Sequence, residues 1–460
     1  MALSESEARR VVTELLDIRA RERERLDHIH SYLYTDRYRE PQGRRRRPSW
    51  LIPSVPDEIK KLAEFSRVDM LPYIVRAAYQ SLYVEGFRRP RADQNEPSWI
   101  AWQRNQMDAR QIGIHKAALG YGKAYATVLP SDTQDGVPVI RGASPRKLTT
   151  AWGDDDMFPE FALEKVGTGK RWRLIDNTNV YWFEGDVDGI HRVEFIASGV
   201  HGITWGGEPV CPVILYRETN DLDEPVIGLV EPLMDLQDQI NFTTFSLMVA
   251  QHFGAFKQRA IAGWIPESEQ EKVRASVERL WTFLNENMKF FEFSETDLEG
   301  YLKSREASYR NLATIAQQSP YELLGTLTNL SADALALADA SRQRAAVEYS
   351  KVLGEAHEQM LGLAGQQMGV EYDPTAEIRW QDTSVQTLAQ FVDALGKAAQ
   401  MLEIPPRALW EPFADKIGAS QTEVERWERI RREEGAVATI NQIMGRLSRQ
   451  RGTGTGGSNG

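Results

Sequence analysis

The chain has one cysteine, Cys211, and seven histidines among its 460 residues. A single cysteine cannot form an internal disulfide and excludes a cysteine-rich zinc site. The histidines are scattered, with no HExxH or similar ligand spacing, so we expect no bound metal. Cys211 lies between Val210 and Pro212 in an apolar run. We therefore expect it to be a small, buried core residue.

Long hydrophobic runs are also missing. No apolar stretch reaches the roughly 18 residues that a membrane-spanning helix needs. The N-terminal MALSESEARR lacks the charged-then-apolar order of a signal peptide. We expect a cytosolic protein without a membrane partner.

Catalytic signatures are equally scarce. LGYGKAYA (Leu119–Ala126) superficially resembles a phosphate-binding loop, but Ala117 and Ala124 stand where that motif needs Gly and Ser or Thr. We expect a helix end turning into a strand there. No GxSxG pattern occurs, and the acidic run Asp154–Asp156 is typical of a solvated turn. The sequence predicts neither a catalytic residue nor a cofactor, and we expect the chain not to be an enzyme.

The net charge of −11 argues against a sequence-reading DNA-binding protein, which carries a concentrated positive face. It does not exclude a channel along which DNA slides, because every tight phosphate contact there adds to affinity and slows movement.

Residues 4–34 have helical periodicity, and Ser4 and Glu7 have the spacing of a capping box. GRRRRPSW (Gly43–Trp50) then carries the run Arg44–Arg47. Such a run is typical of a solvated loop, although a contact to nucleic acid or to an acidic partner stays open.

The segment Ile52–Arg88 predicts a helix, with Gly86 as its C-cap. From 123 to 217 the hydrophobic period shifts toward two, and turn signals such as Asp135-Gly136 separate about seven short strands. We expect a β-rich domain.

A helix is predicted from Glu231, with Pro232 at its first position. Residues 221–251 hold six carboxylates and neither Lys nor Arg. An aromatic-rich insert follows at 253–300, and a second helix covers 301–318. The pattern breaks at Ser319-Pro320 and resumes as an alanine-rich helix to about 368. One strand at Ala376–Trp380 and further helices complete the chain.

This order resembles the portal proteins of tailed bacteriophages, in particular those of long-tailed phages of Gram-positive hosts. RVDMLPYIVRAAYQSLYVEGFR (Arg67–Arg88) is similar to their wing helix with a trailing V-x-G-F, and ASPRKLTTAWG (Ala143–Gly153) to their SPR strand entry. EPVIGLVEPLMDLQDQIN (Glu224–Asn241) resembles the first stem helix, and AFKQRAIAGW (Ala255–Trp264) the step into the clip. SPYELLGTLTNLSADALALADA (Ser319–Ala340) resembles the tunnel loop and the following long helix.

The resemblance implies a ring-forming α+β portal fold with a mainly helical wing, stem and crown, a β-rich wing subdomain and a small α/β clip insert. The implied divisions follow the chain order: N-terminal helix and basic arm 1–50, wing 51–222, first stem helix 223–252, clip 253–300, second stem helix 301–318, tunnel loop 319–331, long kinked helix and return strand 332–382, helical crown 383–447 and disordered tail 448–460.

It also implies a function. Such chains form homo-oligomeric rings, typically dodecamers, at one capsid vertex of the virion and assemble in the host cytoplasm. Their partners are the terminase large subunit, the major capsid and scaffolding proteins, the head–tail adaptor and double-stranded DNA, bound without sequence preference during packaging and ejection.

The resemblance and the residue chemistry together give four groups of candidate site residues. The loop expected to face DNA contains Thr326, Thr328, Asn329 and Ser331. The cations expected to make weak phosphate contacts are Lys257, Arg259, Lys303, Arg305 and Arg310, and the clip interface contains Phe256, Trp264, Trp281, Phe283, Phe290 and Phe291. The acidic stem band, which we expect to be uncompensated by cations, contains Glu231, Asp235 and Asp238.

Two alternatives stay open at this point. A minor head or scaffold-binding protein without a channel has no need of the helix–insert–helix at 231–318. A nucleic-acid-processing enzyme requires convergent carboxylates or a phosphate loop, and neither pattern is found.

Overall fold

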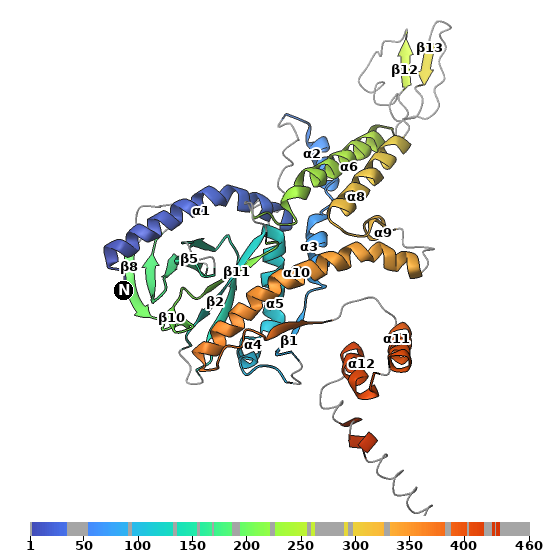
Figure 1. Cartoon of the computed structure of the whole chain (residues 1–460). Coiled ribbons are helices and arrows are strands. Elements are labelled where there is room, and N and C mark those ends of the chain that lie inside the picture. Colours follow the sequence, from blue (N-terminus) through green and yellow to red (C-terminus); the bar gives the residue numbers. More distant parts are fainter. Residues whose placement is uncertain are drawn as a thin grey trace, which may run out of the picture. The chain divides into compact units, whose positions relative to one another are not determined.

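The computed structural model divides the chain into two units, Met1–Arg379 and Trp380–Gly460 (Figure 1). It describes residues 2–34, 54–90, 94–131, 136–153, 157–167, 170–185, 194–220, 226–254, 259–262, 289–292, 298–325, 332–381, 388–402, 404–417, 426–427 and 429–432. The run Arg44–Arg47 and the C-terminal tail lie outside these residues. No described helix is both long and apolar enough to cross a membrane.

The N-terminal helix α1 (Glu5–Leu33) confirms the capping box, because the Ser4 side chain accepts from the Glu7 backbone and the Glu7 carboxylate accepts from the Ser4 backbone. Its first half packs on a five-stranded sheet. Ala8, Val12 and Leu15 contact a core that includes Trp172 and Phe183. The helix therefore covers one face of this sheet (Figure 1).

All strands of the five-stranded sheet are antiparallel to their neighbours. Their order is β4 (Leu148–Ala151), β5 (Phe161–Val166), β6 (Arg171–Ile175), β7 (Asn179–Glu184) and β8 (Glu194–Val200).

A second sheet has three antiparallel strands, in the order β11 (Val213–Arg217), β2 (Lys123–Leu129) and β3 (Val139–Ala143). A core cluster containing Tyr125, Ile175 and Cys211 joins the two sheets. Cys211 is 1% exposed, which confirms its predicted burial.

All seven expected strand segments form strands. β4 lies within Ala143–Gly153, the segment that resembles the SPR strand entry, although hydrophobic alternation did not mark it. Alternation also did not mark the two-residue pair β9 (Thr204–Trp205) and β10 (Glu208–Pro209). Elements this short carry too little alternation to be recognised.

Four helices follow α1: α2 (Asp57–Phe65), α3 (Leu71–Tyr79), α4 (Trp99–Arg104) and α5 (Met107–Tyr121). Helix α5 packs on the three-stranded sheet, α3 and α4 pack on α5, and α2 packs on α6 (Met234–Gly254). The prediction of Gly86 as a helix C-cap is wrong. The helix ends at Tyr79, and Gly86 lies in β1 (Val84–Arg88), which pairs with β14 (Glu377–Trp380) from the far end of the sequence. Local periodicity could not reveal this long-range partner.

The Leu119–Ala126 segment is a helix end and not a phosphate loop. Gly122 follows α5 with φ of 88°, a left-handed conformation that glycine adopts without steric cost, and β2 begins at Lys123. A Cβ on Gly122 would lie 2.8 Å from the Gly228 nitrogen, and one on Gly228 would lie 2.3 Å from the Gly122 nitrogen. The two glycines thus allow the segment that enters the stem to press against the end of α5.

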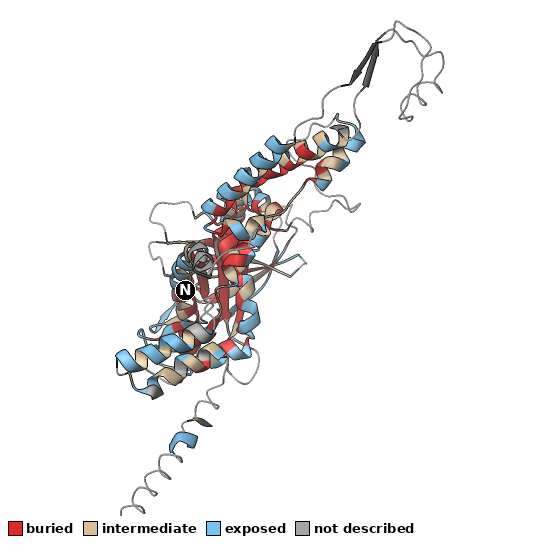
Figure 2. Ribbon diagram, turned by 90° about the vertical axis from the view of Figure 1, so that its right-hand side faces the viewer, coloured by how far each residue is buried: buried red, intermediate tan, exposed pale blue. Residues whose placement is uncertain are grey.

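The two segments expected to form the stem make a helical hairpin, which is called the stem below. A short 3-10 turn, η2 (Glu231–Leu233), leads into α6 (Met234–Gly254), which packs on α8 (Glu299–Ile315). Between them β12 (Arg259–Ala262) pairs with β13 (Lys289–Glu292). In Figure 2 the buried residues of the hairpin lie where its helices face each other and the exposed ones lie outward.

After the hairpin, the short helix α9 (Pro320–Leu324) precedes the long helix α10 (Ala332–Gln367), which packs against β11. The second unit contains α11 (Leu388–Met401), the 3-10 turn η3 (Pro406–Leu409) and α12 (Trp410–Ile417). The further helices that the sequence predicts after Trp380 are thus present in the described part of this unit.

A buried chain of hydrogen bonds joins α5, α10 and β11. His115 Nδ1 must donate to the Leu82 carbonyl oxygen at 3.1 Å, because a carbonyl only accepts. In neutral His115 the Nε2 atom then accepts from His357 Nε2, at 2.8 Å. His357 Nδ1 is left to accept from the Tyr216 hydroxyl at 3.0 Å. All three rings are fully buried.

This network predicts acid-sensitive folding. Burial lowers the pKa of His115 to about 4 and also lowers the pKa of His357. In the unfolded chain a histidine has a pKa of about 6.5. Between this pKa and the lower pKa of the folded state, the unfolded chain binds more protons, so the free energy of unfolding falls as the pH falls. Each buried histidine contributes a slope of up to about 1.4 kcal/mol per pH unit. Denaturant unfolding of the wild type and of His115→Gln at pH 7 and pH 5 should show a smaller loss in the variant.

The exposed His28 provides the matched control, because His28→Gln leaves the buried network of His115, His357 and Tyr216 in place. Glu218 acts in the opposite direction, since burial raises its pKa to about 7. Only a comparison between single-histidine variants therefore isolates the network. An equal pH dependence in His115→Gln and wild type would contradict the prediction.

Candidate functional site

The stem hairpin and the segments that fix its base contain most of the described candidate residues. Two buried amides on α6 hold the connection between α2 and α3. Gln237 Oε1 accepts from the Met70 backbone at 2.9 Å, and Asn241 Oδ1 accepts from the Val68 backbone at 2.9 Å. Gln237 also donates to the Val68 carbonyl. Because buried amides left without partners are costly, these bonds fix how α6 leaves the wing.

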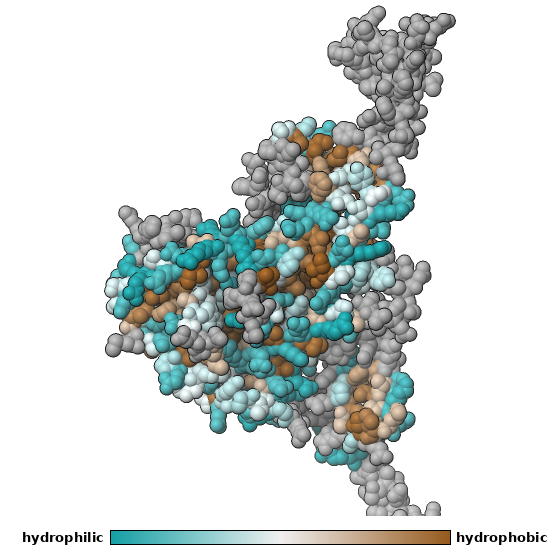
Figure 3. All heavy atoms as spheres, turned by 45° about the horizontal axis from the view of Figure 1, so that its top comes forward, coloured by the Kyte–Doolittle hydropathy of each residue, from teal (hydrophilic) through white to brown (hydrophobic). Residues whose placement is uncertain are grey.

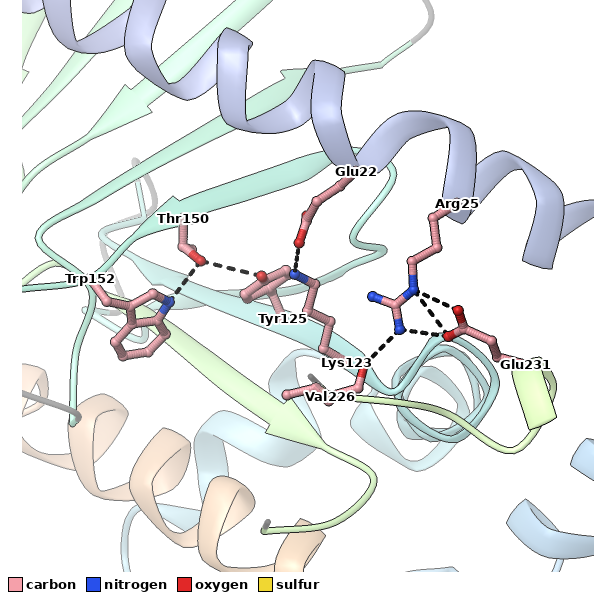
Figure 4. Close-up of polar contacts among 8 residues, drawn as sticks. All are labelled: Glu22, Arg25, Lys123, Tyr125, Thr150, Trp152, Val226 and Glu231. Atoms are coloured by element: carbon pink, nitrogen blue, oxygen red, sulfur yellow. Dashed lines mark hydrogen bonds and ion pairs between the residues drawn. The ribbon is translucent and has the colours of Figure 1, made fainter. Parts of the chain in front are cut away.

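The first residue of the predicted acidic band is not uncompensated. Glu231 accepts from Arg25 of α1 through both carboxylate oxygens, with a closest distance of 2.6 Å. Arg25 also donates to the Val226 carbonyl at 2.9 Å (Figure 4). The hydrogen bond to Glu231 raises the pKa of Arg25. Beside this pair, Lys123 contacts Glu22 of α1 at 2.6 Å. Glu231 therefore belongs to a structural ion pair.

The other two carboxylates of the band differ in setting. Asp235 is exposed, whereas Asp238 is half-buried beside Tyr32 of α1. Burial, and next the Asp238 carboxylate, raise the pKa of Tyr32, so this hydroxyl stays protonated and can donate to Asp238. From 231 to 254 the chain has no Lys or Arg of its own. The negative charge at the base of α6 is thus reduced by Arg25 and remains at Asp235 and Asp238.

The predicted phosphate-contacting cations are brought partly together. Lys303 pairs with Glu299 at 2.8 Å, and Arg310 lies 3.8 Å from Glu306, both on the exposed surface of α8. Arg305 and Arg310 line one pocket of about 710 Å³ between α8 and α9, and Arg305 Nε has no hydrogen-bond partner there. Lys257 lies outside the described residues, and Arg259 is placed by its backbone in β12.

Several candidates cannot be located. The loop residues Thr326, Thr328, Asn329 and Ser331 lie outside the described residues, and so do Phe256, Trp264, Trp281 and Phe283 of the insert. Phe290 and Phe291 lie in β13, opposite Ile261 and Ala260 of β12. The start of the expected 319–331 loop is the short helix α9. Within the described ranges, no group of three or more His, Cys, Asp or Glu residues is arranged to hold a metal ion.

Sequence reasoning missed two features of this site. Arg25 lies about two hundred residues before Glu231, in a helix with many charges, and nothing in the pattern marks it as a partner. The α8–α9 pocket depends on a turn after Ile315, where Gln317 has a positive φ of 53°. Glutamine gives no sequence signal for this conformation, which glycine favours. The break at Ser319-Pro320 is the one signal that pointed to a corner.

Two solved chains are similar: one in the "Neck of native GTA particle computed with C12 symmetry" (TM-score 0.45, 14% identity, 78% of this chain and 96% of that chain covered) and one in the "Neck of empty GTA particle computed with C6 symmetry" (TM-score 0.45, 13% identity, 80% and 95% covered). No curated protein matches the chain. The family described as "Phage portal protein, SPP1 Gp6-like" matches residues 13–436. The chain therefore belongs to the SPP1 Gp6-like phage portal protein family.

Proposed function

We propose that the chain is one subunit of a twelve-membered portal ring at a capsid vertex of the virion, through which double-stranded DNA is packaged and ejected. The match to the portal family over residues 13–436 carries this proposal. The described hairpin supports it, because α6 and α8 flank an insert in the order of a stem and a clip.

The parts of the chain receive roles on this basis. Residues 51–222 form the wing, 223–252 and 301–318 the stem, 253–300 the clip and 383–447 the crown. The clip docks the terminase large subunit and later the head–tail adaptor, while the major capsid and scaffolding proteins surround the ring. The role is structural, without catalysis, and ATP hydrolysis belongs to the terminase.

The negative charge of α6 suits a channel through which DNA must slide without binding tightly. Helix α6 carries Asp235 and Asp238 but no Lys or Arg, and twelve copies multiply this charge. A negative wall repels phosphate, so DNA slides and does not adhere. Lys257, Arg259, Lys303, Arg305 and Arg310 are the cations available for weak, sequence-independent phosphate contacts near the ends of the stem.

Ring formation is the first expected result. The purified full-length chain should give rings with a hole of roughly 20 Å or more in negative-stain images, as the dimensions of B-DNA require. Sedimentation should show the same assembly. A chain that remains monomeric at high concentration in both low and high salt would contradict the proposal.

The 326–331 loop should affect DNA movement and not folding. Thr326, Thr328, Asn329 and Ser331 offer hydroxyl and amide groups, whose contacts to a DNA backbone are individually weak. Replacing Thr328 and Asn329 together by Arg should leave rings intact and slow packaging in a terminase-driven assay, because twelve added pairs of cations bind phosphate. The matched variant Thr328→Ser with Asn329→Gln should package normally. Normal packaging by the arginine variant would show that the loop does not face the channel.

The insert should serve as an interface. Trp281→Ala should weaken adaptor or terminase binding in a pull-down, because aromatic residues are enriched in protein interfaces. Trp152→Ala, in the wing, provides the comparison and should bind both partners normally. If Trp281→Ala assembles and binds like wild type, the insert aromatics form only a local core.

A further inference from the structure

We infer that the free edge of β11 is a docking groove in which an extended segment of a partner protein adds to the three-stranded sheet as a further strand. The segment carries a carboxylate and an aromatic side chain two residues apart. This inference goes beyond the proposed function and concerns the first unit outside the stem. The groove has a volume of about 780 Å³, and its lining includes Trp152, Trp205, Leu215, Arg217, Lys351 and Tyr372.

The backbone of β11 is paired on one side. In its sheet β11 is an edge strand, and its neighbour is β2. The Glu218 nitrogen donates to the Gly122 carbonyl at 2.9 Å, and in an antiparallel ladder the residues that face the neighbouring strand alternate. The N–H and C=O groups of Leu215 and Arg217 therefore point away from β2. Within the described ranges these four groups have no hydrogen-bond partner, and such an edge is a template for another strand.

Strand β8, at the edge of the five-stranded sheet, is not equivalent. Its pairing with β7 has a register shift between Trp182 and Phe183. A bulge of this kind twists an edge strand and hinders further pairing. No shift interrupts the pairing of β11 with β2, which runs from Val213 to Arg217. β11 therefore keeps the regular edge that an added strand needs.

Two walls flank this edge. Helix α10 provides one wall with Val352 and Ala356, and Trp152 lies in the other. Figure 4 shows Trp152 beside the yellow-green strand β11, with α10 below them. The Trp152 Nε1 atom donates to Thr150 Oγ1 at 3.0 Å, which holds the ring in place. A strand in the groove therefore sends alternate side chains toward α10 and toward Trp152.

One end of the groove is aromatic. Trp205 and Tyr372 line it, with ring centroids 4.7 Å apart. Gln359 Nε2 of α10 donates to the Met157 carbonyl at 2.7 Å, which joins the two walls there. The Glu358 carboxylate at this end already accepts from the backbone of β14 at 2.9 Å. An aromatic side chain suits this end because aromatic rings pack well against one another.

The other end of the groove is positively charged. Arg217 and Lys351 line it, and neither forms an ion pair within the part of the chain that the structure describes. Burial, and next the charge of Glu348, raise the pKa of the neighbouring Glu218 to about 7. Glu218 is therefore only a partial counter-charge near neutral pH. Glu355 lies one turn further along α10, so a partner carboxylate is attracted to the two cations.

The spacing of these features defines the segment. Leu215 and Arg217 are alternate residues of β11, so their side chains share one face and lie about 7 Å apart. A partner residue opposite Leu215 meets Trp152, and one opposite Arg217 meets the cations. In an antiparallel strand, the commoner arrangement, the carboxylate comes first and the aromatic residue follows after one intervening residue.

A strand fits this site better than a helix or an apolar face. On the face that Figure 3 shows, hydrophobic atoms reach the surface in patches that hydrophilic atoms interrupt. A partner that relied on apolar contact alone would meet a broken surface there. Strand addition instead uses backbone hydrogen bonds for affinity and pockets for alternate side chains for specificity. A helix has no free backbone groups along its length to offer.

Peptide binding gives the first test. The probe is a fluorescein-labelled peptide, Thr-Val-Glu-Thr-Phe-Val-Thr, whose Glu and Phe fall opposite Arg217 and Leu215. Fluorescence anisotropy with the full-length chain should show saturable binding. N-methylation of this Glu and Phe, whose N–H groups face β11, should weaken binding by about tenfold or more, because two hydrogen bonds are lost. N-methylation of the intervening Thr and the second Val, whose N–H groups face away, should leave the affinity within about twofold.

Charge variants give the second test. Lys351→Glu should weaken binding of the unmodified peptide by about fivefold, because repulsion replaces attraction at the edge of the interface. Lys61→Glu makes the same charge change at an exposed lysine of α2 outside the groove lining and should bind like wild type. Replacing the Glu of the peptide by Gln should remove most of the difference between Lys351→Glu and wild type. Equal losses in both lysine variants would mean that general charge accounts for binding, and the groove assignment would be wrong.

Hydrogen exchange gives the third test by locating the peptide. At single-residue resolution, the Leu215 and Arg217 amides should exchange about tenfold more slowly with peptide bound. The Ile214 and Tyr216 amides already face β2 and should change little. Protection at the β8 edge instead would show that the peptide pairs with the other sheet, and the inference would fall.

These tests are independent of the portal proposal. No saturable binding of the unmodified peptide, or equal binding of the two methylated forms, would overturn the inference. Binding to the dilute chain but not to the assembled ring would also overturn it, because a neighbouring copy would then fill the groove. None of the measurements needs DNA, terminase or the insert, so a negative result leaves the proposed portal function in place. Absence of rings, which would contradict the portal proposal, leaves the peptide measurements valid on the single chain.

Discussion

The arrangement of the first unit depends on how the chain passes from its sheets into the stem. At that point Gly122 and Gly228 bring two backbones closer than any side chain would allow. The Leu229 nitrogen donates to the Leu119 carbonyl at 2.8 Å. Arg25 donates to the Val226 carbonyl and forms an ion pair with Glu231. Because α1 supplies Arg25 while its other half covers the five-stranded sheet, one helix ties the wing core to the base of the stem. This close approach and the hydrogen bonds of Gln237 and Asn241 together position the start of α6.

A buried network of hydrogen bonds fixes the packing elsewhere in the first unit. His115, His357 and Tyr216 come from three elements, and their hydrogen bonds have only one consistent direction, set by the Leu82 carbonyl. Trp102 stands edge-on to His357 with ring centroids 5.2 Å apart. A buried polar network tolerates no substitute geometry, because each unpaired group is costly. It therefore holds α10 against β11.

Much of the fold was accessible from the sequence. Local signals predicted α1 with its capping box, the seven longer strands, the hairpin helices and the burial of Cys211. Long-range pairing was not accessible. Gly86 looked like a helix end because its partner strand, β14, lies almost three hundred residues away. The acidic band looked uncompensated because Arg25 is equally remote. The order of elements and the quoted portal-like segments, more than any single residue, identified the family.

In the proposed ring, the hairpin of α6 and α8 has to meet two demands. A channel wall must bind the passing DNA only weakly, which favours a helix without Lys or Arg. Helix α6 has neither residue. A wall made of separate subunits must also adhere strongly to itself. Two helices have little surface to bury within one chain, so strong adhesion requires apolar side chains that remain exposed until a neighbour arrives. Ile315, at the end of α8, fits that requirement, being 56% exposed in the single chain. The acids on α6, a helix without Lys or Arg, serve the first demand because they repel phosphate.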